Sequence, residues 1–167
     1  QRNYSVSEVE VVDDVIYHKS EYRERRNHFA FFACSEPLAG FDTLREDFLG
    51  AYRGWNNPAA VERGKTSQSI CLGWQPVGVH QIKVNLEPGE TKRIIFLLGY
   101  QENNKEEKFD PADSLTINKK KVKPIISQYR KTAEVDRAFS ALRAHWADLL
   151  NKFQVNTPDV HTNRMVN

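Results

Sequence analysis

Residues 78–100 read GVHQIKVNLEPGETKRIIFLLGY, and this stretch decides the fold class. Between residues 82 and 87 apolar and polar side chains alternate, which predicts a strand with one covered face. Pro88-Gly89 predicts a turn, and the apolar run over residues 94–98 predicts a buried return strand. A half-exposed strand that pairs with a buried one in a hairpin is typical of a β-sandwich, so we expect an antiparallel sandwich.

The segments before this stretch predict further strands. Residues 5–20 are rich in β-branched side chains and are interrupted by Asp13-Asp14, a pattern that favours a hairpin. Residues 29–34 are apolar at every position, which predicts a strand covered on both faces. The sequence SICLGW at residues 69–74 predicts another strand.

A short helix is expected between these strands, within residues 41–55. Thr43 and Glu46 have the spacing of a capping box, and apolar residues recur every four positions after them. The helix should end among Gly50, Gly54 and the Asn56-Asn57-Pro58 break, and we expect a surface loop over residues 54–68.

Beyond Gly99 the pattern changes to a polar loop, residues 101–121, and then to helices. A short helix is expected over residues 122–131, with its proline in the first turn. The longest helix is expected over residues 132–154, with Thr132 as its N-cap. Its apolar positions form one continuous face: Val135, Phe139, Leu142, Trp146, Leu149, Leu150 and Phe153.

A last helix is predicted near the end of the sequence. Thr157 is its expected N-cap, Pro158 its first residue, and Asp159 lies in its first turn. Only about two turns remain before Asn167, which is too short for a stable helix. We therefore expect the chain to be an excerpt of a longer protein, mainly β with C-terminal helices.

The composition excludes several classes of function. The 167 residues carry 24 Lys and Arg against 22 Asp and Glu, a net charge of +2, so we expect no general nucleic-acid or membrane-surface partner. No apolar run approaches the length of about 20 residues that spans a bilayer. Cys34 and Cys71 fall within apolar stretches and are interpreted as small core residues, although a disulfide between them stays open.

The residues that could carry chemistry do not form a complete catalytic set. Asp13-Asp14 are interpreted as turn residues, and Asp42 and Glu46 as solvated or capping groups beside a helix start. The five histidines are scattered, so no metal site is expected. No phosphate-cradling glycine loop, dinucleotide fingerprint or G-x-S-x-G motif is present.

Two surface features leave alternatives open. Arg23, Arg25 and Arg26 alternate with glutamates; they are either an ion-paired strand edge or guanidinium groups that face a polyol or another subunit. The three aromatic residues Tyr22, Trp55 and Trp74 either stack on sugar rings or pack against the protein.

Long stretches of the sequence resemble the bacterial cellobiose phosphorylases of glycoside hydrolase family 94, and the resemblance covers essentially the whole chain. The stretches are QRNYSVSEVEV, VIYHKSEYRERRNHFAFFACSEPLAGFDTLREDFLGAYRGW, GWQPVGVHQIKVNLEPGETKRIIFLLGY, KFDPADS and KFQVNTPDVHTNRMVN. The resemblance implies a supersandwich-type partial β-sandwich at residues 1–115, a helical linker at 116–155, and the first helix of an (α/α)6 catalytic barrel at 156–167.

The resemblance also implies an activity for the intact enzyme. Phosphate attacks cellobiose with inversion, giving α-glucose 1-phosphate and glucose, while one carboxylic acid protonates the departing oxygen. That aspartate and the phosphate-binding residues would lie beyond Asn167, so the excerpt would be inactive alone. The enzyme would need no cofactor, because inorganic phosphate is a co-substrate, and it would be a cytoplasmic homodimer.

Few site residues carry over from the resemblance. It implies that Arg2, and less directly Gln1, reach the subsite of the acceptor sugar, where the fixed donors of a guanidinium bind two hydroxyls. The alternative is that Arg2 is an ordinary surface side chain. Arg23, Arg25, Arg26 and Asn27 would lie near the active-site entrance or a dimer contact. Other open readings are a stand-alone sandwich that binds carbohydrate or a protein, and a relative acting on cellodextrins, laminaribiose or chitobiose.

Overall fold

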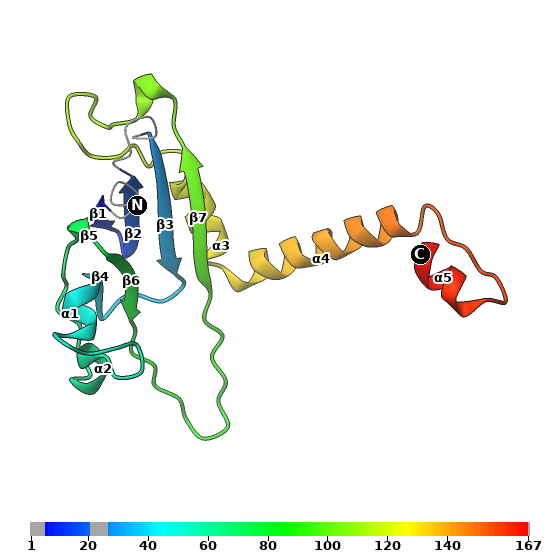
Figure 1. Cartoon of the computed structure of the whole chain (residues 1–167), viewed down its shortest axis with the longest axis horizontal. Coiled ribbons are helices and arrows are strands. Elements are labelled where there is room, and N and C mark those ends of the chain that lie inside the picture. Colours follow the sequence, from blue (N-terminus) through cyan, green and yellow to red (C-terminus); the bar gives the residue numbers. More distant parts are fainter. Residues whose placement is uncertain (1–5, 21–26, 167) are drawn as a thin grey trace. The chain divides into compact units, whose positions relative to one another are not determined.

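A computed structural model describes residues 6–20 and 27–166, with the side chains of Val6, Ser7, Ser20 and Trp74 left out of the description. The chain divides into two compact units, one ending at Arg130 and one beginning at Lys131 (Figure 1). Each unit is described by itself. The sequence-based boundaries near residues 115 and 155 remain a prediction.

The first unit is built on a five-stranded antiparallel sheet with the order β5-β1-β2-β3-β7. Its strands are β1 (Val6–Val12), β2 (Val15–Ser20), β3 (His28–Cys34), β5 (Leu72–Trp74) and β7 (Phe96–Glu102). The predicted hairpin of β1 and β2 is confirmed, and both residues of its turn, Asp13 and Asp14, have positive φ angles near 55–60°. This left-handed geometry is the one that matches the twist of a two-residue hairpin.

A second, two-stranded sheet pairs β4 (Gly40–Leu44) with β6 (Pro76–Gln81). The hairpin predicted within residues 78–100 is therefore wrong, because β6 pairs with β4 and β7 pairs with β3. Residues 82–95 are a loop between the two sheets, and the predicted turn is present as a hydrogen bond from the Glu90 amide to the Glu87 carbonyl at 2.9 Å. The two strands belong to different sheets, and the fold is a partial β-sandwich.

Two short helices, α1 (Arg45–Leu49) and α2 (Ala59–Glu62), follow β4. A short helix was expected here and is confirmed, and it ends at Gly50 with φ of 83°. The predicted capping box is wrong: Leu44 precedes the helix without a side-chain cap. The Thr43 hydroxyl instead donates to the Ser69 carbonyl at 2.9 Å and accepts from the Cys71 amide at 2.8 Å. Thr43 thus joins β4 to the segment before β5.

The core divides between the two faces of the large sheet. One face packs Val15, Tyr17, Phe29, Phe31 and Ala33 against Ile117, Val122 and Ile126. The last two belong to the segment around α3 (Lys123–Tyr129), which carries its proline in the first turn as predicted. The other face packs Val9, Ile16 and Cys71. Both cysteines are buried thiols, as expected of small core residues.

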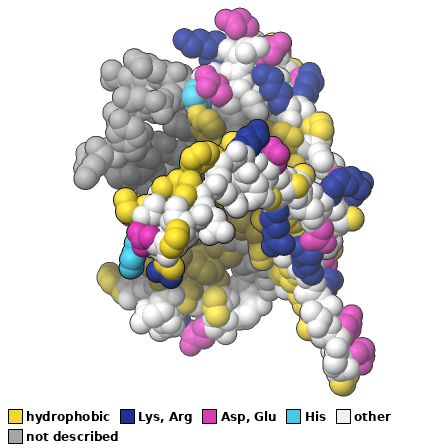
Figure 2. All heavy atoms as spheres, turned by 90° about the vertical axis from the view of Figure 1, so that its right-hand side faces the viewer, with side chains coloured by type: hydrophobic (Ala, Val, Ile, Leu, Met, Phe, Trp, Pro, Cys, Tyr) yellow, Lys and Arg dark blue, Asp and Glu magenta, His cyan; other side chains and the backbone are white. Residues whose placement is uncertain are grey.

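Strand β7 departs from the prediction in its burial. The sequence predicts a buried strand, yet Leu98 is 77% exposed and Tyr100 is 63% exposed. They alternate with Leu97 and Gly99, which face the core, so only one side of β7 is covered. The following segment carries the short 3-10 helix η2 (Lys105–Glu107), and in Figure 2 acidic and basic side chains lie side by side at this upper end.

The second unit consists of α4 (Thr132–Leu150) and α5 (Val160–Val166). Both helices were predicted, but the N-cap of α4 is Lys131 rather than the predicted Thr132. Asp159, not Thr157, accepts bonds from the first turn of α5, from the His161 amide at 2.9 Å and the Thr162 hydroxyl at 2.7 Å. These bonds hold the pKa of Asp159 below its usual value. Among the described residues, no helix combines the length and apolar character needed to cross a bilayer.

Candidate functional site

The two residues predicted to reach the acceptor sugar, Gln1 and Arg2, lie outside the described residues, and so do Arg23, Arg25 and Arg26. Tyr22 and the side chain of Trp74 are outside the description as well. Two of the residues singled out from the sequence, Asn27 and Trp55, are described. The site is therefore built from the residues that flank the undescribed segments.

The flanking residues lie at one end of the large sheet. In the β1–β2 pair Ser7 is opposite Ser20, and in the β2–β3 pair Lys19 is opposite Phe29. In the β3–β7 pair the first residue of β3, His28, is opposite the last residue of β7, Glu102. The start of β1, the end of β2, the start of β3 and the end of β7 therefore share this end of the sheet. It is the end to which residues 1–5 and 21–26 connect.

A polar cleft of about 440 Å³ opens at this end. We define it by its lining residues, Asn27, Glu102, Asn103, Asn104, Lys105 and Glu106. Asn27 is buried, and its side-chain amide donates to the Asn103 carbonyl at 2.5 Å. The Asn103 amide returns a bond to the Asn27 carbonyl at 3.0 Å, and its side chain donates to the Asn118 carbonyl at 2.8 Å. The floor of the polar cleft is thus fixed to both β3 and the segment after η2.

The exposed groups of the polar cleft suit a ligand with many hydroxyls. Glu102 is paired with His28, with 3.3 Å between its Oε1 and the histidine Nε2, and its side chain is 61% exposed. Lys105 and Asn104 add a cation and an amide in the same cleft. Amides, carboxylates and an ammonium can bind sugar hydroxyls in both hydrogen-bond directions. An exposed carboxylate of this kind lacks the burial that fits a general acid to its task.

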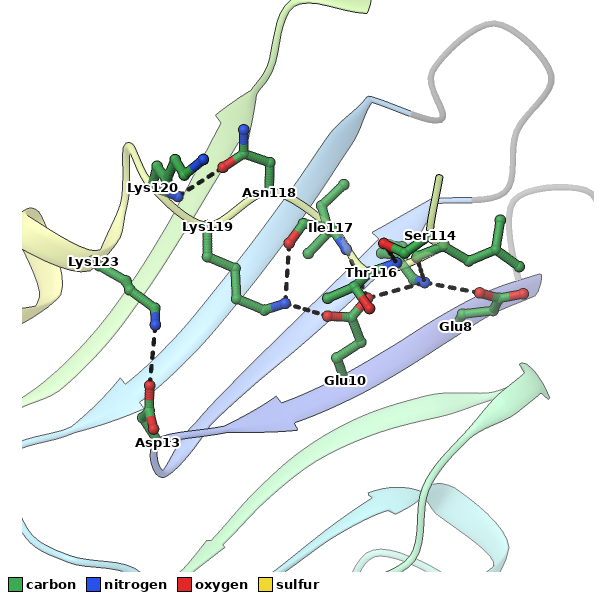
Figure 3. A network of polar contacts seen from close by, with 12 residues as sticks. Glu8, Glu10, Asp13, Ser114, Thr116, Ile117, Asn118, Lys119, Lys120 and Lys123 are labelled. Carbon is green, nitrogen blue, oxygen red and sulfur yellow. Dashed lines mark hydrogen bonds and ion pairs between the residues drawn. The ribbon is translucent and has the colours of Figure 1, made fainter. Parts of the chain in front are cut away.

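A buried ionic network holds the segment behind the polar cleft against the sheet (Figure 3). Lys19 of β2 contacts Glu8 at 2.9 Å and Glu10 at 3.0 Å, and it donates to the Leu115 carbonyl at 2.8 Å. Lys119 forms a close ion pair with the other carboxylate oxygen of Glu10. The Ile117 amide also donates to Glu10, at 3.0 Å. One carboxylate from β1 therefore receives two lysines and a backbone amide.

The network shifts the pKa values of its members in opposite directions. Burial alone would raise the pKa of Glu10, but the bonds from Lys119, Ile117 and Lys19 outweigh it and the pKa is lowered. Burial alone would lower the pKa of Lys19, but its contacts with Glu8 and Glu10 raise it. Glu10 and Lys19 are therefore both held in their charged forms. Glu8 and Glu10 alternate on β1, a pattern that could have signalled a charged site, but nothing local points to Lys119, which lies 109 positions after Glu10.

A second polar cluster, which the sequence analysis misread, surrounds Asp42. This residue was interpreted as a solvated or capping group, but it is fully buried. Its Oδ1 accepts from the Ser67 amide at 2.9 Å, the Ser69 amide at 3.1 Å and the Ser69 hydroxyl at 2.9 Å. Asp42 therefore ties the loop before β5 to β4. Among the described residues, histidine, cysteine and carboxylate side chains do not gather into any group of three that could hold a metal ion.

Comparison with known proteins bears directly on these observations. Residues 1–132 match the family model described as the glycosyl hydrolase 94 supersandwich domain. The chain belongs to this family. The match includes both sheets, the polar cleft and the ionic network, and it ends at the start of α4.

Curated relatives of this supersandwich chain are enzymes of saccharide metabolism. It is 31% identical over 139 residues to an N,N'-diacetylchitobiose phosphorylase of Vibrio proteolyticus, covering 83% of the chain and 15% of that protein. It is 27% identical over 157 residues to a solabiose phosphorylase of Paenibacillus borealis, covering 93% and 18%. It is 26% identical over 139 residues to the cyclic β-(1,2)-glucan synthase NdvB of Rhizobium meliloti, covering 83% and 4%. The chain spans less than a fifth of the length of these relatives.

Proposed function

We propose that the chain is the later part of the sandwich domain of an inverting glycoside phosphorylase, and that it contributes to sugar binding rather than to the chemical step. The family match over residues 1–132 is the observation that carries this proposal. Phosphorylases among the relatives support the reaction class. In this mechanism phosphate attacks the anomeric carbon and one carboxylic acid protonates the leaving oxygen. We propose that this acid is an aspartate outside the 167 residues, in an (α/α)6 barrel that begins near residue 156.

Cellobiose is the substrate that we propose first, on the resemblance of long stretches such as residues 15–55 to cellobiose phosphorylases. The products would be α-glucose 1-phosphate and glucose. The names of the relatives, which include chitobiose and solabiose phosphorylases, favour testing a related disaccharide alongside it. Under the same proposal the enzyme is a cytoplasmic homodimer without a cofactor.

The position of the polar cleft supports the proposed role of the residues before β1. Gln1 and Arg2 precede β1, whose start lies at the same end of the sheet as the polar cleft. We propose that Arg2, with Gln1, binds the hydroxyls of the acceptor sugar. The guanidinium offers two parallel donors, a geometry that two adjacent hydroxyls of a pyranose can accept.

A substrate panel tests the reaction class and the substrate together. The full-length protein is incubated with inorganic phosphate and, separately, cellobiose, laminaribiose, N,N'-diacetylchitobiose and solabiose. We expect phosphate-dependent release of a sugar 1-phosphate with the α configuration, measured by NMR, and the highest kcat/KM with cellobiose. Sugar release that does not require phosphate would contradict the reaction class. A higher kcat/KM with another member of the panel would replace cellobiose but keep the class.

A further inference from the structure

A second cleft, at the opposite end of β7 from the polar cleft, has aromatic walls. It has a volume of about 670 Å³, and we call it the Trp55 cleft. Its principal lining residues are Phe32, Phe48, Trp55, Asn56, His80 and Phe96. Phe96 and Glu102 are the first and last residues of β7, so the two clefts are about 20 Å apart along the strand.

The wall formed by the two sheets is a stack of three rings. Phe32 of β3 stacks on His80 of β6, with ring centroids 4.1 Å apart and planes at 7°. Phe32 also stacks on Phe96, with centroids 6.1 Å apart and planes at 17°. Gly78 permits this arrangement, because a Cβ there would lie 3.2 Å from the Phe32 ring. Phe96 is still 55% exposed, so its ring remains open to a ligand.

Trp55 forms the other wall. Its ring lies 6.1 Å from the ring of Phe48 at an angle of 44°, and the Arg45 guanidinium lies over it at 5.4 Å. These two contacts hold the indole in place while 59% of the residue stays exposed. An indole that is fixed and exposed loses little entropy when a ligand stacks on it.

Polar groups accompany the rings. The Asn56 amide lines the cleft beside Trp55. Both ring nitrogens of His80 are buried, so this ring contributes to the wall of the cleft by stacking on Phe32. Burial and then the charge of Arg130 lower the pKa of His80 to about 4, so at neutral pH the ring carries one donor and one acceptor. A few polar groups among apolar walls are typical of small-molecule sites of 300–1,000 Å³.

We propose that the Trp55 cleft binds a β-linked oligosaccharide. Pyranoses joined by equatorial bonds present flat faces of C–H groups, which pack on aromatic rings, and their edges carry hydroxyls that amide groups such as that of Asn56 can bind. The choice of a saccharide rests on the proposed function and on the saccharide-metabolising relatives. The volume of about 670 Å³ is large enough for about two sugar rings.

Binding is tested in the full-length protein with cellotetraose and with N,N',N'',N'''-tetraacetylchitotetraose, without phosphate so that no phosphorolysis occurs. Hydrogen exchange is measured by mass spectrometry, and dissociation constants by calorimetry. We expect at least one of the two probes to slow amide exchange in residues 48–61. Trp55→Ala should weaken binding of that probe at this site about 10-fold, and Trp55→Phe less than 3-fold.

The matched control is Tyr52→Ala, since Tyr52 is a fully exposed aromatic residue of the same connection that does not line the cleft. It should leave the dissociation constant unchanged. If Trp55→Ala fails to fold, Asn56→Ala decides, with an expected loss of at least 3-fold. Unchanged exchange in residues 48–61 with both probes, or equal binding by the wild type and the cleft variants, would overturn the inference. Phosphorolysis is assayed separately, so its absence would count against the proposed function and not against the cleft.

Discussion

Glu10 joins β1 to β2 and to residues 117–119. It pairs with Lys119 and Lys19 and accepts the Ile117 amide, so its loss would leave Lys119, which is 7% exposed, without its acidic partner. Removing one partner of a buried pair costs about 3–5 kcal/mol. We expect Glu10→Gln to speed amide exchange in residues 115–120 by about 100-fold, measured by mass spectrometry. Asp148→Asn, which removes an exposed partner of Lys152, is the control and should change exchange by less than 2-fold.

His80 gives the first unit a dependence on pH. Its pKa falls from 6.5 to about 4 on folding because the ring is buried, so folding favours the neutral form. The contribution of neutral His80 to the free energy of unfolding is fully present above pH 6.5, and it is lost as the pH falls from 6.5 through 4. We expect the melting temperature to decrease between pH 7 and pH 4.5, and His80→Phe to reduce that decrease. An identical decrease in the variant would assign it to other groups, of which His18, whose pKa is also lowered by burial, is the first to test.

The proposed role of Arg2 in binding the acceptor sugar can be separated kinetically from the binding of α-glucose 1-phosphate. If it binds the acceptor sugar, Arg2→Ala should raise the KM for glucose in the synthetic direction about 10-fold while the KM for α-glucose 1-phosphate changes less than 2-fold, because the guanidinium contacts only the acceptor. Initial rates with each substrate varied in turn measure this. Arg2→Lys, which keeps the charge but loses the paired donors, should fall between the two. Equal losses for both substrates, or none, would remove Arg2 from the subsite.

At the scale of elements, Gly99 sets the contact between β3 and β7. It lies directly opposite Phe31, and a Cβ at this position would be 2.1 Å from the end of the Phe31 ring. Overpacking of this kind costs about 1–3 kcal/mol. We expect Gly99→Ala to lower the melting temperature by several degrees and Leu98→Ala, on the exposed side of the same strand, to change it little. Recovery of stability in Gly99→Ala combined with Phe31→Leu would confirm that the ring is the obstacle.

The same strand explains how much of the fold the sequence could predict. Local signals predicted the β1–β2 hairpin, the run at β3 and the helices α3, α4 and α5, because turn residues and periodicity lie within a few positions of one another. Pairing between strands that are far apart in the sequence left no such local signal. The alternation at residues 82–87 and the turn at Pro88-Gly89 describe a hairpin locally, yet β6 and β7 pair with strands from residues 28–44.

For the candidate sites too, local patterns indicated single residues, but not the partners that lie far away in the sequence. Trp55 was singled out from the sequence as an aromatic residue with two readings, but its partners Phe32, His80 and Phe96 come from three strands. Asp42 was misread because it lies beside the helix start that Thr43 and Glu46 suggested, whereas its partners are Ser67 and Ser69 in a later loop. The polar cleft likewise joins Asn27 to residues 102–106. Sequence patterns therefore found candidate residues, and only the fold brought their partners together.

At the scale of the whole molecule, the exposed side of β7 predicts how residues 1–167 behave alone. The strand lies at the edge of its sheet, and Leu98 and Tyr100 expose most of their surface there. A flat apolar edge strand is a site of association unless another element covers it. We expect residues 1–167 to bind the dye ANS and to form concentration-dependent oligomers in analytical ultracentrifugation, and Leu98→Lys with Tyr100→Lys to reduce both. The full-length protein should bind less dye per molecule, because we expect its further residues to cover this strand. A monodisperse monomer of residues 1–167 that binds no dye would instead favour a stand-alone sandwich module.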